Sequence, residues 1–291
     1  MKKFHYVLLF IVVATSVALK SDNPAYLLYS ADGKEVKYKN LVNDALDADI
    51  VLFGELHNNP IVHWLELELT KDIFAEKGKD MVMAAEMFET DNQLLLNEYL
   101  EGTIKQSNFE KEVKLWPNYS TDYKPLVEFA KKNSLRFVAS NIPRRYASLV
   151  NSKGFEGLES LSADAKMLIA PLPVAYDPEL PGYKSMMDTT GSMGQSHVTP
   201  NLPKAQAIKD ATMANSILKN WQNGKLLIHY HGSFHSDNFD GIYWYLKKQN
   251  PDLKILTISS VEQDTIQNLN KDYLKRADYI ICVPSNMTKT Y

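Results

Sequence analysis

Polar residues follow three apolar segments of this chain, and each of these segments is typical of a buried strand. Residues 54–57 (GELH) follow the first, Glu86 follows the second, and residues 229–235 (HYHGSFH) contain the end of the third. Open α/β sheets bind their ligands at the carboxyl ends of parallel strands. Imidazoles beside carboxylates hold zinc or iron and also serve as general acids and bases. The sequence therefore predicts a polar site at one edge of a sheet.

A further group of chemically suggestive residues is the run of residues 141–146 (NIPRRY), which follows another apolar segment. Positive charge near a tyrosine favours the phenolate, and tyrosinate is a proximal ligand of ferric haem. Arginines also suit the propionates of haem. Without other support, this run is more typical of an exposed helix with solvated charges.

Several familiar signatures are absent from the chain. It has no Gly-x-Ser-x-Gly, no Walker loop, no His-Glu-x-x-His and no Gly-x-Gly-x-x-Gly. The single cysteine, Cys282, lies in an apolar segment, where an inert core position is expected. One cysteine also excludes an internal disulfide and any multi-cysteine metal site. A net charge of −3 argues against nucleic acid as a partner.

Short apolar runs alternate with longer amphipathic ones, which predicts an α/β fold. We expect a mostly parallel sheet flanked by helices on both faces. Residues 170–203 interrupt this alternation with six prolines and three glycines. They predict an irregular insertion, partly helical near residues 183–189, that is either a binding element or a surface excursion. Strands are expected at residues 49–53, 81–85, 136–140, 226–230, 254–258 and 279–283, and helices at 60–76, 92–100, 124–132, 144–150 and 162–169.

The N-terminus predicts export. Lys2 and Lys3 precede an apolar run at residues 6–13, and Ser16-Val17-Ala18 fits the small-x-small rule for signal peptidase. We expect a signal peptide at residues 1–18, an N-terminal extension at 19–44 and one α/β domain at 45–291. The absence of a nearby cysteine argues against a lipoprotein, so the expected location is the periplasm or cell envelope of a bacterium.

Residues 54–57 (GELH), 141–146 (NIPRRY) and 231–235 (HGSFH) together resemble the ChaN-like haem-binding uptake family of the Tiki superfamily, which carries paired Gly-x-x-His motifs. The resemblance covers roughly residues 45–265. It implies haem as cofactor, a tyrosine on the iron, a homodimer with two haems close together, and a role in haem or iron uptake, with an outer-membrane haem receptor or transporter as a further partner.

The residue that best matches the iron ligand is Tyr146, and His197 in the insertion is the expected second contact. Arg144 and Arg145 are expected near the propionates. Tyr176 and Tyr183 are weaker alternatives as ligands.

Other Tiki members are hydrolases or metal-dependent proteases, so a second site is expected at the paired motifs. The alternative function is a metal-dependent hydrolase of the erythromycin-esterase type, with Glu55 as general base and a divalent metal on His57, Glu86, His231 and His235. Haem binding without catalysis is the leading hypothesis.

Overall fold

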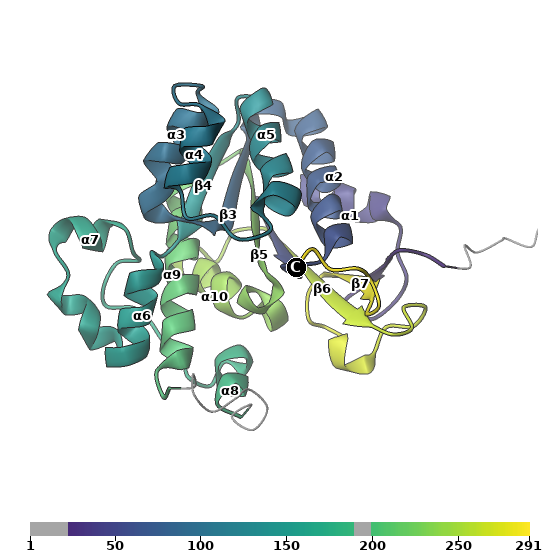
Figure 1. The fold of residues 1–291 in the computed structure, drawn as a ribbon. Coiled ribbons are helices and arrows are strands. Elements are labelled where there is room, and N and C mark those ends of the chain that lie inside the picture. The colour runs from purple at the N-terminus through teal and green to yellow at the C-terminus, as the bar shows by residue number, and fades with distance from the viewer. Residues whose placement is uncertain (1–22, 189–198) are drawn as a thin grey trace, which may run out of the picture.

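The computed structural model describes residues 23–188 and 199–291 (Figure 1). A seven-stranded sheet in the order β1-β7-β6-β2-β5-β3-β4 forms its centre. Every neighbouring pair is parallel except β1 and β7, which confirms the predicted α/β class. The strands are β1 (Leu27–Ser30), β2 (Ile50–Glu55), β3 (Met81–Glu89), β4 (Arg136–Asn141), β5 (Leu226–Gly232), β6 (Ile255–Gln263) and β7 (Tyr279–Pro284).

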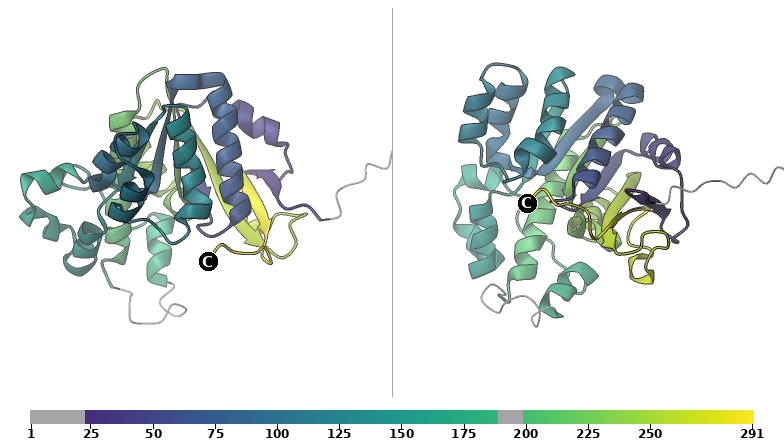
Figure 2. Two further views of the ribbon diagram at one scale, coloured as in Figure 1. Left: turned by 45° about the horizontal axis from the view of Figure 1, so that its top comes forward. Right: turned by 45° about the vertical axis from the view of Figure 1, so that its right-hand side comes forward.

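Helices cover both faces of the sheet, as the views in Figure 2 show. Helices α1 to α5 pack with one core, and α6, α9 and α10 pack with the other. The helices are α1 (Tyr38–Leu46), α2 (Pro60–Lys77), α3 (Gln93–Leu100), α4 (Gln106–Glu112), α5 (Lys124–Lys132), α6 (Arg144–Lys153), α7 (Ala163–Met167), α8 (Pro181–Asp188), α9 (Leu202–Asn220) and α10 (Gly241–Gln249).

Strand β2 illustrates why the central strands have continuous apolar sequences. Ile50 and Leu52 face the core beneath α9, whereas Val51 and Phe53 face the core beneath α2. Because successive side chains enter opposite cores, the residues at odd and at even positions of the strand must all be apolar. Helix α2 begins directly afterwards, where the Asn59 side chain accepts hydrogen bonds from two backbone amides of the first turn.

Several parts of the fold differ from the sequence prediction, which contained no helix at the positions of α4 and α10. The expected N-terminal extension contributes β1, which pairs with β7, and most of α1. Helix α9 had no predicted counterpart. It is buried around most of its circumference and rich in alanine, so it lacks the single apolar stripe by which an amphipathic helix is recognised.

The predicted insertion is only partly described. Helix α8 lies close to the helical segment expected there and packs against α9 (Figure 1). The predicted signal peptide at residues 1–18 lies outside the described residues. Within the described ranges, none of the helices combines the length and apolar character needed to cross a bilayer.

Candidate functional site

The two Gly-x-x-His motifs pack directly against each other at the carboxyl ends of β2 and β5. These strands are neighbours, with Glu55 opposite Gly232. A Cβ atom on Gly232 would lie 2.7 Å from Nε2 of His57, and one on Gly54 would lie 2.9 Å from Cα of Ser233. Each glycine therefore makes room for part of the other motif.

His57 is the partly exposed imidazole of this site. Its side chain is 40% exposed, and its Nδ1 lies 2.7 Å from Oε1 of buried Glu55. The ring meets Trp116 edge-on, with 4.9 Å between centroids. Burial lowers the pKa of His57, but the hydrogen bond and charge of Glu55 outweigh it, so the net pKa is raised. Glu55 accepts the hydrogen bond from Nδ1 of His57 and so orients the imidazole ring. His57 is the more exposed of the two residues, so it is better placed to exchange protons with a ligand.

His235 belongs to a buried relay of charged groups. Its Nδ1 is 2.5 Å from Oδ1 of Asp210 on α9, and its Nε2 is 3.2 Å from Oε1 of Glu86 on β3. Tyr183 of α8 donates to Asp210 at 2.7 Å. Burial opposes the charged form of His235, but the charges of Glu86 and Asp210 raise its pKa to about 10. These contacts connect β3, α9 and the predicted insertion. They include Tyr183, one of the alternative haem ligands, as a hydrogen-bond donor to Asp210.

His231 has a different environment from His57 and His235. Its Nδ1 lies 3.0 Å from Nδ1 of His229, and its Nε2 lies 2.8 Å from Oγ of Ser236. Nε2 of His229 lies 2.8 Å from Oγ of Ser140, so these hydrogen bonds form a continuous series. Burial lowers the pKa of His231 to about 4, so both histidines are neutral near pH 7. Both ring nitrogens of His231 therefore have hydrogen-bond partners, His229 and Ser236. The sequence instead predicts that His231 binds a metal together with His57.

Three ionisable residues of the site were absent from the sequence prediction. They are His63 and Glu66 on α2, which lie beside Glu55, and Asp210 on α9. His63, Glu66 and Thr70 interrupt the apolar face of α2 at helical spacing, and this buried polar stripe could have been recognised. Asp210 gives no comparable signal, because its partner His235 is 25 residues away in the sequence.

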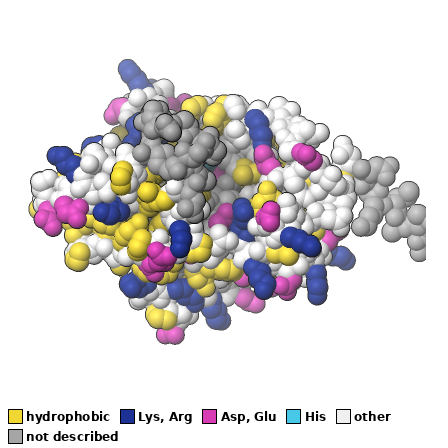
Figure 3. Space-filling view, turned by 90° about the horizontal axis from the view of Figure 1, so that it is seen from below, with side chains coloured by type: hydrophobic (Ala, Val, Ile, Leu, Met, Phe, Trp, Pro, Cys, Tyr) yellow, Lys and Arg dark blue, Asp and Glu magenta, His cyan; other side chains and the backbone are white. Residues whose placement is uncertain are grey.

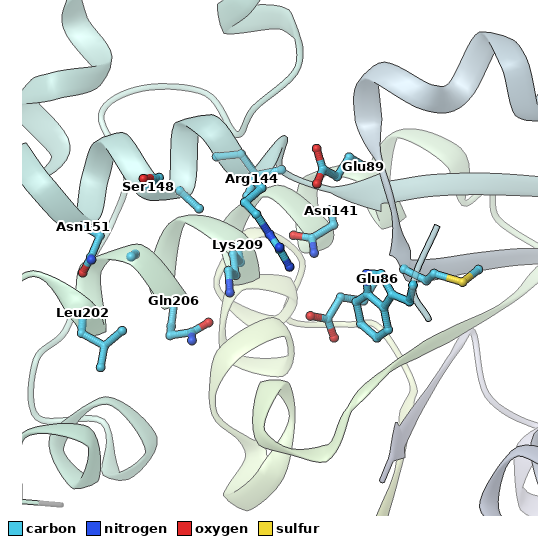
Figure 4. Close-up of a pocket in the computed structure, with 14 residues that line it drawn as sticks. Glu86, Glu89, Asn141, Arg144, Ser148, Asn151, Leu202, Gln206 and Lys209 are labelled. Carbon is cyan, nitrogen blue, oxygen red and sulfur yellow. The ribbon is translucent and has the colours of Figure 1, made fainter. Parts of the chain in front are cut away.

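A cavity of about 270 Å³ opens beside Glu86, between the ends of β3 and β4 and helices α6 and α9. Arg144, Asn141 and Lys209 point into the same space, and Glu86 lies across from them (Figure 4). The apolar part of the lining consists of Met87, Trp116, Ile142, Ala147, Leu202 and Ala205. The cavity therefore offers two cationic side chains, Arg144 and Lys209, and two acidic ones, Glu86 and Glu89, next to apolar surface.

Tyr146 and Arg145 lie on α6 but do not line this cavity. Tyr146 is partly buried against the core beneath α9, and the guanidinium of Arg145 stands 4.5 Å from the centre of its ring. Arg145 also pairs with Asp91 at 2.5 Å. Of the two predicted propionate contacts, Arg144 is the one that reaches the cavity. His197 lies outside the described residues.

Sequence comparison identifies the family of this chain. The family described as "Haem-binding uptake, Tiki superfamily, ChaN" matches residues 41–246. The chain belongs to this family. The ChaN-family match spans both Gly-x-x-His motifs, Tyr146 and the cavity described above, so it includes every predicted site residue.

This ChaN-family chain is similar to two solved structures and one plant protein, at 13–24% sequence identity. The cofacial haem complex of ChaN from Campylobacter jejuni has a TM-score of 0.62 and 16% identity, covering 88% of this chain and 96% of that one. A Bacillus cereus protein has a TM-score of 0.51 and 13% identity, covering 84% and 90%. The Arabidopsis thaliana protein RETICULATA-RELATED 5, chloroplastic, is 24% identical over 196 residues, which are 62% of this chain. The match spans only 26% of that plant protein.

Proposed function

We propose that this protein binds ferric haem on the face formed by α6 and the start of α9. The observation that carries the proposal is the ChaN-family match across the whole of this region. The cofacial haem complex of the similar Campylobacter jejuni protein supports it. Bound haem would supply a ferric iron centre, and Tyr146 on α6 is the residue that we propose would bind this iron.

The residues of the cavity suit an amphipathic anion such as haem. Arg144 and Lys209 can pair with propionates, and the apolar lining can contact the macrocycle. At about 270 Å³, the cavity is small for enclosing a cofactor of this size, so part of the ring would extend beyond it. Hydrophobic side chains also gather at the surface on the α6–α8 side when the carboxyl edge of the sheet is seen from below (Figure 3).

A second copy of the chain would cover the part of the ring that one cavity leaves exposed. We therefore propose a homodimer with haem between the protomers. His197 precedes α9 by a few residues and is the proposed second contact. We further propose that the protein is exported after removal of residues 1–18 and functions in haem uptake at the cell envelope with a haem receptor or transporter.

A haemin titration followed by visible absorption tests this proposal. We expect saturable binding with the high-spin ferric spectrum of tyrosinate ligation, and Tyr146→Phe should change that spectrum and lower the affinity at least tenfold. Tyr243→Phe is the matched control, because Tyr243 is also partly buried against the core beneath α9. Arg144→Ala should weaken binding without changing the spectrum. Equal binding and equal spectra for wild type and Tyr146→Phe would refute the ligand assignment, and no saturable binding would refute haem binding.

Hydrolysis is a second candidate function, favoured by the arrangement of His57, Glu86 and His235. Electrostatic coupling links His57 to both Glu86 and His235, and the charge of Glu86 raises the pKa of His57. A partly exposed imidazole that is oriented by a buried carboxylate can serve as a general base. In this arrangement Glu55 positions His57, and His57 performs the proton transfer.

Ester hydrolysis by the haem-free protein tests this second function. His57→Asn should abolish turnover of activated esters, whereas Tyr146→Phe should leave it unchanged. Absence of turnover in the wild-type protein, with and without added zinc or manganese, would exclude hydrolysis of these esters.

A further inference from the structure

A separate cluster of ionisable side chains lies between the end of β2 and helix α2. Nδ1 of His63 is 2.9 Å from Oε2 of Glu66 and 3.4 Å from Oε2 of Glu55. The exposed fractions of Glu55, His63 and Glu66 are 3%, 4% and 0%. One nitrogen and two carboxylates therefore meet in a region without access to bulk water.

In the described part of the chain, neither carboxylate of this cluster pairs with a lysine or an arginine. Among the described residues, the ion pairs of Glu55 and Glu66 involve only histidines. Oε2 of Glu55 and Oε1 of Glu66 are fully buried and accept no hydrogen bond. Two neighbouring carboxylates cannot both remain charged in a dry site unless a proton or a cation lies between them.

One distance within the cluster equals the separation of neighbouring ligands of a small metal ion, and another is a few tenths of an ångström shorter. Bonds of about 2.0–2.2 Å in a tetrahedral site place neighbouring ligand atoms roughly 3.3–3.6 Å apart. The separation of His63 Nδ1 from Glu55 Oε2 is 3.4 Å, and its separation from Glu66 Oε2 is 2.9 Å. A shift of a few tenths of an ångström by Glu66 would therefore admit an ion.

Surrounding hydrogen bonds hold the outer atoms of His63 and Glu55, so that Nδ1 of His63 and Oε2 of Glu55 face each other and Glu66. Nε2 of His63 lies 3.1 Å from the carbonyl oxygen of His57 and can donate to it, which leaves the Nδ1 lone pair directed at the carboxylates. Oε1 of Glu55 accepts from Tyr123 at 2.5 Å and from His57 at 2.7 Å. Oε2 of Glu55 is the oxygen that remains, and it is the one that faces His63.

We propose that Glu55, His63 and Glu66 bind a first-row divalent cation, zinc or manganese, at a site separate from the haem face. One imidazole and two carboxylates form a ligand set that both ions accept. The cation would link α2 to the end of β2. Because Glu55 also holds His57, the ion would fix the position of the first Gly-x-x-His motif.

Metal content and calorimetry of the purified full-length protein test this site. After chelation and dialysis, titration with Zn²⁺ or Mn²⁺ should show one saturable site per chain, and the bound ion should raise the thermal midpoint. Glu66→Gln keeps the side-chain shape and should lower the affinity at least tenfold. The matched control is Glu68→Gln on the same helix, because Glu68 is only partly buried and pairs with exposed Lys71. This control should bind like wild type.

Two further measurements separate this site from its surroundings. His235→Asn should still bind the cation, because His235 contacts Glu86 and Asp210 and not the proposed ligands. Glu66→Gln should still bind haemin. If circular dichroism shows that Glu66→Gln is unfolded, Glu66→Asp replaces it and should also weaken binding. The proposal is wrong if the wild-type protein shows no saturable site for either ion, or if the affinity is unchanged in the folded Glu66 variant.

Discussion

Alanine substitutions at Gly54 and Gly232, the glycines of the two motifs, should have different effects. The first should mainly lower stability, and the second should mainly displace His57. A Cβ atom at residue 54 would lie 2.7 Å from the carbonyl oxygen of Ile258 and 2.9 Å from Cα of Ser233. Both atoms belong to the backbone, so the strands themselves would have to separate. A Cβ atom at residue 232 would lie 2.7 Å from Nε2 of His57, which belongs to a partly exposed side chain that can rotate away. Neither glycine has a positive φ, so only steric contact distinguishes them.

The expected magnitudes follow from these contacts. Overpacking against fixed atoms costs about 1–3 kcal/mol, and replacing glycine recovers about 0.4–1 kcal/mol by restricting the unfolded chain. Gly54→Ala should therefore lower the free energy of unfolding by about 1.3 kcal/mol, the difference between these two effects. In Gly232→Ala, loss of the bond between His57 and Glu55 costs about 1 kcal/mol, so stability should change by less than about 1 kcal/mol.

Urea unfolding and histidine NMR would measure the two effects. Gly54→Ala should shift the unfolding midpoint, with a thermal midpoint lower by roughly 3–5 °C. Gly232→Ala should instead bring the pKa of His57 back toward about 6.5, because the ring leaves Glu55. Equal destabilisation by both variants, or wild-type stability of Gly54→Ala, would refute the steric argument.

Two other predictions concern the buried histidines. Asp210→Asn should destabilise the protein by about 3 kcal/mol, because it removes one partner of buried His235, whereas Asp252→Asn at an exposed position should have no effect in the same urea experiment. The free energy of unfolding should also fall as the pH is lowered from about 6.5 to about 4, since the folded state keeps His231, with its pKa of about 4, neutral while the unfolded chain takes up the proton. The contribution of His231 is about 3 kcal/mol, and His231→Asn should flatten this part of the profile; a wild-type profile without a slope there would contradict the assignment. His235 acts in the opposite sense, and its stabilisation is lost as the pH rises from about 6.5 toward 10.

Much of the functional region could be predicted from local sequence. The apolar runs of β2, β3 and β5 are buried on both faces, so each is recognisable without its neighbours. The polar residues after them lie at the carboxyl edge because parallel strands all end on the same side. The family resemblance, now supported by the match over residues 41–246, also rested on short local motifs.

The pairing of side chains depends on the order of the strands, which no local pattern reveals. β5 lies between β2 and β3, and this order places Gly232 against His57 and brings Glu86 to His235. Asp210 comes from a helix that lacks a recognisable apolar stripe, so neither its element nor its contact with His235 was predictable.

The amino-acid sequence was sufficient to predict the fold class, the edge of the sheet that carries the polar residues, and the motifs that place the chain in its family. The protonation of the histidines, in contrast, depends on contacts that form when the chain folds. His231 and His235 are four residues apart, yet burial lowers the pKa of His231, whereas the charges of Glu86 and Asp210 outweigh burial and raise the pKa of His235. Protonation depends on the charges within a few ångströms in space, and those charges come from segments far apart in the chain.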